Sequence, residues 1–182
     1  MGNLLPDSYE AALKLIEPYL VKPVVYHACP KDCIVFRGRY ADLKECPKCH
    51  SKRYTDETKR KPARKFIYLP IGPRLARLFG SSSTAEILQN HSHTCHEEMY
   101  DIHDSPAWER AYSSEGVFRG DTRGLSLALC TDGVNPFSHN KVSYSMWPIM
   151  LTILNLPQEA RNHFDNMLLV GIVPGNGSKL NI

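Results

Sequence analysis

Apolar residues in the first part of the chain recur at helical spacing. Leu13, Ile16 and Leu20 follow this pattern and predict a short amphipathic helix over residues 8–20. Further short helices are predicted at residues 71–79, between Pro73 near the first turn and Gly80 after the last, and at residues 84–90 and 108–112.

Two of these helices are preceded by signals for a helix start. Asp7 with Glu10 three residues later resembles a capping box, and Ser83 with Glu86 offers a second one. These pairs place the beginnings of the first and third helices.

The pattern changes at residue 125, where apolar residues fall in strand-length runs bounded by Gly, Pro or Asn. The runs are Leu125–Cys130, Ile149–Leu154 and Met167–Val173. Three consecutive strands with short connections favour an antiparallel meander. Such a meander needs cover on one face, and the 58 residues from 125 onward are too few to supply it. We therefore expect the chain to stop within a domain.

The segment between the first helix and residue 65 has a different character. It holds four cysteines and two short β-prone pieces, Val24–Tyr26 and Ile34–Phe36. Residues 56–65 are predicted to be a charged linker. Short helices and a run of consecutive strands together indicate an α+β fold.

Composition narrows the class of protein. Hydrophobic residues make up 42% of the chain and charged residues 23%, which indicates a globular protein. No apolar run approaches the roughly 20 residues that span a bilayer, and the start of the chain lacks a signal-peptide pattern. We expect an intracellular protein with reduced thiols, so its six cysteines are better explained as metal ligands and spare thiols than as disulfides.

Four cysteines form two close pairs, Cys29 with Cys33 and Cys46 with Cys49, separated by twelve residues. Two short turns of this kind present four thiolates tetrahedrally to one zinc ion. His27 and His50 flank the pairs, so a histidine could replace one cysteine, but four cysteines are the simpler ligand set. Four protein ligands leave no open position for water or substrate, which makes the predicted ion structural.

Two further segments have both a functional and an ordinary interpretation. Seven Lys and Arg residues within 52–65 fit a nuclear-import patch or a phosphate-contacting arm, but also a solvated linker, and Asp56 and Glu57 interrupt the run. The stretch from His91 to His103 fits a second metal site or a solvated polar loop.

Asp132 directly follows the first apolar run, in the sequence Leu-Ala-Leu-Cys-Thr-Asp-Gly. A carboxylate at a strand end beside a glycine turn is a common place for a Mg²⁺ ligand. Spacing alone equally fits an ordinary Asp-Gly turn.

Several segments, in order and at matching spacing between residues 24 and 177, resemble the transposases of CACTA (En/Spm) DNA transposons. They are residues 29–33 (CPKDC), 40–43 (YADL), 45–49 (ECPKC), 69–79 (LPIGPRLARLF), 83–86 (STAE), 103–108 (HDSPAW), 129–137 (LCTDGVNPF), 143–148 (SYSMWP) and 155–157 (NLP). Nine uncommon sequence segments in the same order indicate this family far more specifically than any single motif does.

The resemblance implies a zinc ribbon ahead of an RNase H-like catalytic core that opens with three antiparallel strands. Family members cut and join DNA with an acidic triad that holds two divalent ions. Asp132 matches the first acid of that triad, so the resemblance implies a catalytic role for it. Mg²⁺ or Mn²⁺ would be needed only by a full-length relative, because the other two acids are expected beyond residue 182. Asp165 lies between the second and third predicted strands, which is the wrong place for either.

Four regions are therefore predicted: an N-terminal helix (1–24), a zinc ribbon (25–55), a basic linker with short helices (56–124), and a truncated RNase H-like core (125–182) with an incomplete three-stranded antiparallel sheet. The expected function is that of a transposase-derived fragment that binds DNA through its zinc ribbon in the nucleus and has lost cleavage and strand transfer.

The alternative expectation is a zinc-ribbon module that binds a protein and no nucleic acid. A third is an inert fragment that folds poorly because its sheet is incomplete. A membrane or a small-molecule substrate is not an expected partner.

Overall fold

The computed structural model describes residues 5–90, 98–136 and 144–175. The α-helices are α1 (Tyr9–Ile16), α2 (Gly72–Phe79), α3 (Ser82–Gln89), α4 (Pro106–Tyr112) and α5 (Gln158–Arg161). Short 3-10 helices are η1 (Glu17–Tyr19), η2 (Gly38–Tyr40), η3 (Ile102–Asp104) and η5 (Phe164–Asn166). The strands are β1 (Val24–Ala28), β2 (Tyr54–Asp56), β3 (Lys61–Pro62), β4 (Arg64–Tyr68), β5 (Leu127–Thr131), β6 (Trp147–Ile153) and β7 (Met167–Val173).

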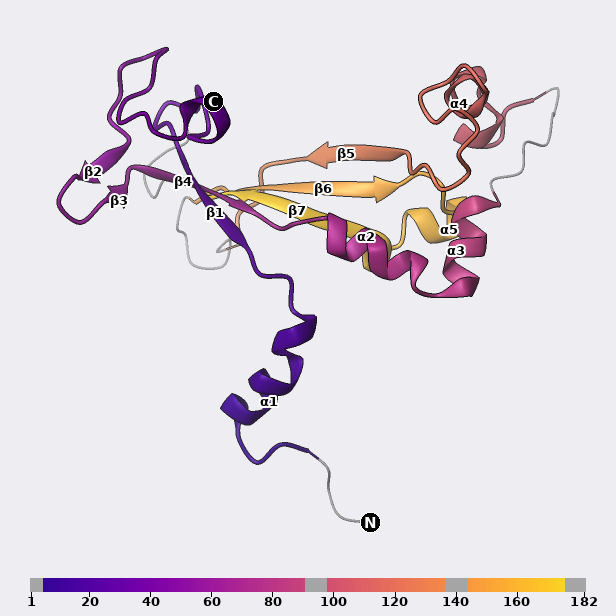
Figure 1. Ribbon diagram of the computed structural model, residues 1–182, viewed down its shortest axis with the longest axis horizontal. Coiled ribbons are helices and arrows are strands. Elements are labelled where there is room, and N and C mark those ends of the chain that lie inside the picture. The colour runs from indigo at the N-terminus through magenta and orange to yellow at the C-terminus, as the bar shows by residue number, and fades with distance from the viewer. Residues whose placement is uncertain (1–4, 91–97, 137–143, 176–182) are drawn as a thin grey trace.

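The fold is α+β, as predicted, and is built on one antiparallel sheet with the strand order β1-β4-β7-β6-β5. β5, β6 and β7 form the predicted meander (Figure 1). The prediction of a three-stranded sheet is wrong. The sheet has five strands, because β4 pairs with β7 and β1 pairs with β4. The cysteine-rich segment and the meander therefore contribute strands to the same sheet, across the predicted boundaries at 55 and 124.

The prediction of a linker over residues 56–65 is wrong. β2 and β3 form a small hairpin, and β4 begins at Arg64. The charged residues made β4 look like a linker in the sequence. In the strand, Arg64 and Phe66 lie on one face and Lys65 and Ile67 on the other. The β4 backbone pairs with β1 on one side and with β7 on the other. The β-prone piece Ile34–Phe36 makes only one isolated bridge, between Val35 and Ala28.

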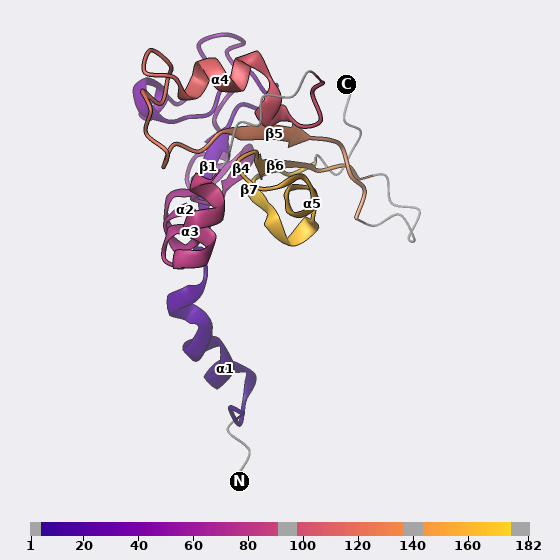
Figure 2. The ribbon, with the colours of Figure 1, turned by 90° about the vertical axis from the view of Figure 1, so that its right-hand side faces the viewer.

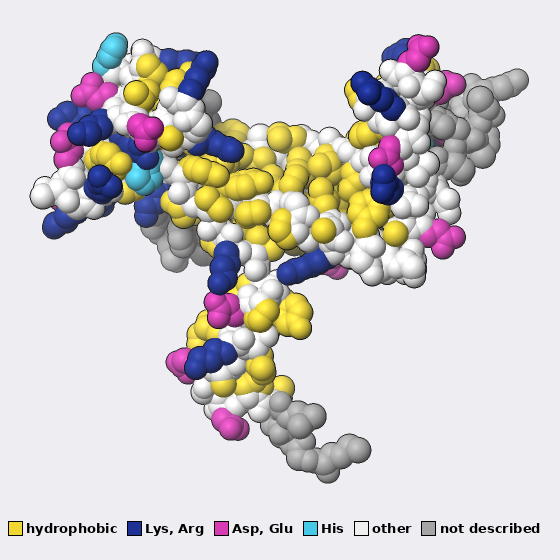
Figure 3. All heavy atoms as spheres, viewed as in Figure 1, with side chains coloured by type: hydrophobic (Ala, Val, Ile, Leu, Met, Phe, Trp, Pro, Cys, Tyr) yellow, Lys and Arg dark blue, Asp and Glu magenta, His cyan; other side chains and the backbone are white. Residues whose placement is uncertain are grey.

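The main core lies at one end of the sheet, where α2 and α3 cover one face (Figure 2). Its buried residues are Leu88, Ile153, Leu156, Leu168 and Val170. The rest of that face is open, and Figure 3 shows a broad apolar surface over the strands. Leu129 on β5 is 67% exposed. The prediction that the meander lacks full cover is consistent with this exposed surface.

The predicted helices are present, but their caps differ. Ser8, not Asp7, caps α1 and accepts a hydrogen bond from the Ala11 amide, and Ser81, not Ser83, caps α3. α1 projects from the sheet with no buried residue (Figure 1). In the described ranges, no helix is long and apolar enough to cross a membrane.

Asn155, which is 1% exposed, joins three parts of the fold. Its Oδ1 accepts a hydrogen bond from the Ser126 amide, 2.8 Å away. Its Nδ2 donates to the carbonyl oxygens of Leu88 and Gly124 and to the hydroxyl of Tyr112. From the end of β6, this one side chain thus binds three parts of the fold: the end of α3, the end of α4 and the loop before β5.

Candidate metal centre

The four cysteines predicted as ligands meet at one point. Their Sγ atoms all lie within 4.8 Å of one another, and Cys29 Sγ is 3.3 Å from Cys49 Sγ. Cys29 and Cys46 are fully buried, while Cys33 and Cys49 are half-buried. In the part of the chain that the structure describes, this is the one cluster of three or more His, Cys, Asp or Glu groups able to hold a metal ion.

Local backbone bonds shape the two turns that carry these cysteines. Cys29 follows β1, and its carbonyl oxygen accepts a hydrogen bond from the Asp32 amide, 3.0 Å away. In the second turn, the His50 amide donates to the carbonyl oxygen of Cys46, 2.8 Å away. Asp32 and His50 both have a φ of 57°, a left-handed conformation that lets each short turn fold back on itself.

The thiols of this cluster differ in acidity because of their neighbours. The Ser51 hydroxyl lies 3.3 Å from Cys49 Sγ, and hydrogen bonding to the thiolate lowers the pKa of Cys49 to about 6. Hydrogen bonding to Cys49 raises the pKa of Cys33 to about 12, and burial raises the pKa of Cys29. Cys49 is therefore the most acidic of these three thiols.

A tetrahedral zinc ion fits this donor set. With Zn–S bonds of about 2.3 Å, a four-thiolate site requires sulfur atoms roughly 3.8 Å apart. The spread of the four Sγ atoms is close to this spacing. The four cysteines could hold one metal ion and leave no coordination position for a substrate.

The flanking histidines have other positions. His27 Nδ1 accepts a hydrogen bond from Arg53 Nε, 2.9 Å away, and neither His27 nor His50 belongs to the cluster. The four-cysteine set is thus favoured over a histidine substitution.

Arg53 supports the second turn, a role that sequence reasoning missed. Its guanidinium lies over the rings of Phe36 and Tyr54, at 5.0 and 5.3 Å from their centroids. It also donates to the carbonyl oxygen of Leu43, 3.1 Å away. The sequence shows this arginine only as one member of a basic run, so no local signal distinguishes it.

Asp132 lies where the sequence placed it, directly after β5. It is exposed, and its Oδ1 accepts a hydrogen bond from the Gly133 amide, 2.6 Å away. No metal-binding group of three or more residues within the described ranges includes it. Its catalytic role therefore stays a prediction.

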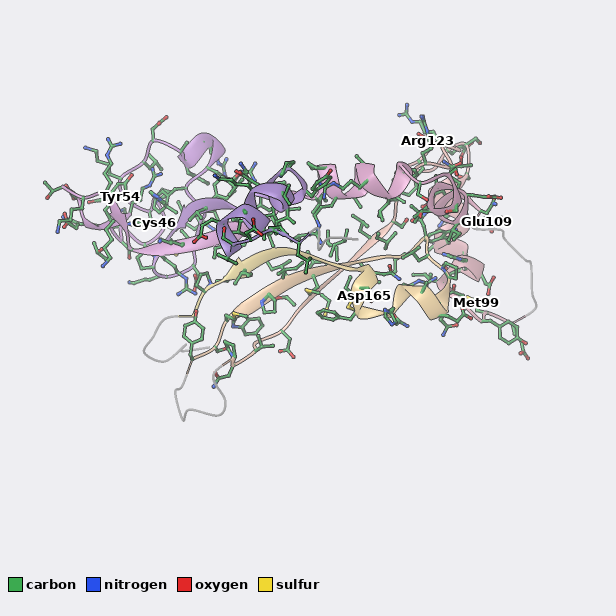
Figure 4. All side chains as sticks on the ribbon, turned by 90° about the horizontal axis from the view of Figure 1, so that it is seen from below. Cys46, Tyr54, Met99, Glu109, Arg123 and Asp165 are labelled. Atoms are coloured by element: carbon green, nitrogen blue, oxygen red, sulfur yellow. The ribbon has the colours of Figure 1, made fainter. Side chains whose placement is uncertain are left out.

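Asp165 lies at the opposite end of the meander from Asp132. Asp132 follows the end of β5 that pairs with Ile149, whereas Asp165 is in η5, just before β7. Figure 4 shows Asp165 well apart from Cys46. The structure thus agrees that Asp165 is in the wrong place to act with Asp132.

The second predicted metal site falls mostly outside the described residues, since His91, His93, Cys95 and His96 belong to 91–97. His103 is described. Its Nε2 lies 2.6 Å from the carbonyl oxygen of Leu154.

Charge is distributed unevenly between the cysteine module, here residues 28–65, and the rest of the chain. The module has twelve Lys and Arg against five Asp and Glu, a net charge of +7, while the rest has ten against fourteen. Ten of the twelve are exposed: Lys31, Arg37, Arg39, Lys44, Lys48, Lys52, Lys59, Arg60, Lys61 and Lys65. Figure 3 shows blue side chains gathered on this module and few over the sheet.

Comparison with known proteins concerns mainly the other half of the chain. Residues 97–180 match the model of the transposase family tnp2. The match supports a transposase family, and it contains α4, the meander and Asp132 but not the cysteine module. No curated protein and no solved structure matches the chain.

Proposed function

We propose that this chain is a transposase-derived protein of the CACTA type that binds DNA through its cysteine module when the module holds zinc. The observation that carries the proposal is the net charge of +7 on the module, in a chain whose other half matches a transposase family. Exposed Lys and Arg side chains bind phosphates and release counterions from the duplex. The same basic surface supports a nuclear location.

Zinc has an architectural role in this proposal. The module has only a small core around Cys29, Phe36 and Cys46, so a bound ion is needed to stabilise the turns that carry the basic side chains. The DNA surface would include Lys59, Arg60 and Lys61 on the hairpin, beside the polar cavity of about 360 Å³ that Arg60 lines.

Fluorescence anisotropy with labelled duplex DNA, measured over a salt series, tests this proposal. We expect affinity to fall steeply with salt, with a log–log slope of about −0.9 for each phosphate contact. Changing Lys59, Arg60 and Lys61 together to Gln should weaken binding and flatten the slope. Changing Arg110, Arg119 and Arg123 to Gln is the matched control, because these exposed arginines lie outside the module.

The outcome against the proposal is equally specific. A role of the module in DNA binding would be contradicted if the affinity did not change with salt concentration or did not fall when zinc is chelated. It would also be contradicted if both triple variants weakened binding equally.

We further propose that the chain alone does not cleave DNA or transfer strands. Asp132 is exposed, and a single carboxylate cannot hold two catalytic ions in register. The RNase H-like assignment of the meander belongs to this proposal and is supported by its three consecutive antiparallel strands. A nuclease assay with Mg²⁺ or Mn²⁺ is the test: turnover that is lost in Asp132→Ala would disprove the proposal.

The alternative function, binding of a protein by the module, is favoured by one feature. A largely apolar cavity of about 410 Å³ lies between the first cysteine turn and the sheet, lined by Ile34, Val35, Phe66 and Val173 among others. A salt-independent interaction that is lost in Val35→Asp would support this alternative.

A further inference from the structure

The hairpin of β2 and β3 is a small two-stranded ribbon within the cysteine module. Figure 1 shows it at the end of the molecule opposite α4 and α5. Residues 57–60 connect its strands, and the Arg60 amide donates to the carbonyl oxygen of Glu57, 3.4 Å away. Arg60 has a φ of 48°, a left-handed conformation that lets the chain reverse there. A two-stranded ribbon fits the major groove of B-DNA, which is about 12 Å wide.

The two acidic residues at the start of this turn have different positions. Asp56 Oδ1 accepts a hydrogen bond from the Lys59 amide, 3.1 Å away, so this carboxylate helps to build the turn. Glu57 points into solvent, with 67% of its side chain exposed, and its Oε1 lies 3.5 Å from the equally exposed Nζ of Lys52. Because an exposed ion pair is worth little in water, Glu57 can exchange this partner for another at low cost.

Glu57 and Arg60 face the same space. Both line the polar cavity of about 360 Å³ beside the hairpin, together with Asp42, Lys44 and Arg53 among others. The hairpin thus presents a carboxylate acceptor and a forked guanidinium donor side by side. Phosphate binding accounts for the arginine but not for the carboxylate, since a carboxylate and a phosphate repel each other.

Arg53 gives this cavity a fixed wall. Its Nε donates to His27 Nδ1, 2.9 Å away, and its Nη1 donates to the carbonyl oxygens of Ala41 and Leu43. Its guanidinium also lies over the ring of Tyr54, the residue at which β2 begins. The base of the hairpin is therefore held against the cysteine module, and recognition by specific contacts requires such rigid support.

We propose that the hairpin enters the major groove and that Glu57 and Arg60 together recognise one G·C base pair, an inference that rests on the proposed binding of DNA. In this groove guanine presents two adjacent acceptors, N7 and O6, and cytosine presents its N4 amino donor next to them. Arg60 donates to both guanine atoms, and the Glu57 carboxylate accepts from the cytosine amino group. An A·T pair lacks the two adjacent acceptors, and it places the thymine O4 oxygen against the carboxylate.

Selection from a library of random DNA duplexes with the zinc-loaded chain tests this recognition. We expect one G·C pair to be enriched. Replacing that pair by A·T should weaken binding about tenfold in fluorescence anisotropy, the effect of losing one bidentate base contact. Replacing its guanine by 7-deazaguanine, which lacks the N7 acceptor but still pairs with cytosine, should also weaken binding.

Variants at the carboxylate separate base recognition from general electrostatics. Glu57→Ala should lose the preference for G·C over A·T, while its affinity for random duplex should not fall, because a negative charge is removed. Glu45→Ala is the matched control, since Glu45 is an exposed glutamate of the module that does not line the cavity, and it should keep the preference. An unchanged zinc content shows that each variant is folded.

Variants at the turn separate base contacts from phosphate contacts. Arg60→Asn, whose side chain tolerates the left-handed φ, should lose both affinity and preference. Lys59→Asn should lose affinity alone, because Lys59 is exposed beside Arg60 but does not line the cavity.

The outcomes against this inference differ from those against DNA binding itself. Binding to random duplex with no enriched pair would overturn the inference and leave the proposed function intact. Enrichment of an A·T pair, or a G·C preference that persists in Glu57→Ala, would overturn it as well. A zinc-loaded chain that binds no duplex at all would contradict both proposals.

Discussion

Asp32 Oδ1 lies 2.8 Å from Arg64 Nε, in an ion pair that connects the first cysteine turn to the central sheet. The Arg64 side chain is almost fully buried, with 4% exposed, while that of Asp32 is 57% exposed. Asp32 stands between Cys29 and Cys33, and Arg64 pairs with Ala28 in the β1–β4 ladder. This ion pair therefore joins the cysteine cluster directly to the sheet.

Removing the charge of Asp32 should destabilise the fold. Asp32→Asn keeps a side chain that tolerates the left-handed φ of this position, so it isolates the loss of charge. A buried guanidinium without its partner is costly, but the exposure of Asp32 reduces the effect to about 1 kcal/mol. Thermal unfolding should show a fall in Tm of roughly 2–4 °C. Asp42→Asn, at another exposed site of the module, serves as the control and should leave Tm unchanged.

Zinc content should depend on the clustered cysteines alone. Protein purified under reducing conditions should contain about one zinc ion per chain, as a four-thiolate site requires. Cys46→Ser should lose the ion, because Cys46 is a buried member of the cluster. Cys130→Ser should keep it, since Cys130 is exposed on β5. Metal analysis of these variants decides the matter, and zinc-free wild-type protein would contradict the site.

Chelation should reach beyond the cysteine turns. The sequence alone predicts unfolding of residues 25–55 with the later strands unaffected, but β1 is paired with β4 in the same sheet. We therefore expect amide hydrogen exchange to increase in β1 and β4 as well, while β5 and β6 keep their protection. Unchanged exchange in β4 after zinc removal would show that the two parts are uncoupled.

Asn155 should be among the most sensitive positions of the fold. Asn155→Leu preserves the approximate volume but leaves the Ser126 amide and the Leu88 carbonyl oxygen without this partner, whereas the Gly124 carbonyl oxygen still accepts from the Tyr112 hydroxyl. Each buried unpaired group costs about 1–3 kcal/mol, so a loss of at least 2 kcal/mol is expected in denaturant unfolding. Asn162→Leu makes the same substitution at an exposed position and should leave the free energy of unfolding nearly unchanged.

Acid should weaken the contact between η3 and α5. Arg161 donates two hydrogen bonds to Asp101, of 2.6 and 2.7 Å, and these bonds lower the pKa of the Asp101 carboxyl. A carboxyl with a lower pKa in the folded state stabilises the fold above its unfolded pKa of about 4. That stability is lost as the pH falls through the folded pKa.

Urea unfolding between pH 7 and pH 2 measures this effect. Asp101→Asn should be less stable than wild type at pH 7 and should approach it at the acid end. Asp42→Asn is the control, because Asp42 is exposed, and it should follow the wild-type profile. If Asp101→Asn is as much less stable than wild type at pH 2 as at pH 7, the Asp101 carboxylate is not the source of the pH-dependent stability.

The sequence by itself determined the features that depend on local spacing. The two close cysteine pairs predicted the cluster, since each pair needs only a short turn, and the apolar runs predicted the three strands of the meander, with Met167–Val173 correct at both ends. Helix existence was also predictable from periodicity. The caps at Ser8 and Ser81 were not, because several neighbouring residues can accept the same bond.

Only the tertiary structure decided the features that join distant segments. β4 was hidden within a basic run, because its identity as a strand depends on β1 and β7 on either side rather than on its own pattern. The partners of Asn155, Arg53 and Arg64 likewise come from segments far along the chain, and a buried polar side chain carries no local signal of its partners. The sequence thus specified the candidate metal ligands. The pairing of β1 with β4 and of β4 with β7 joined the segment that carries them to the same sheet as the residues that match a transposase family.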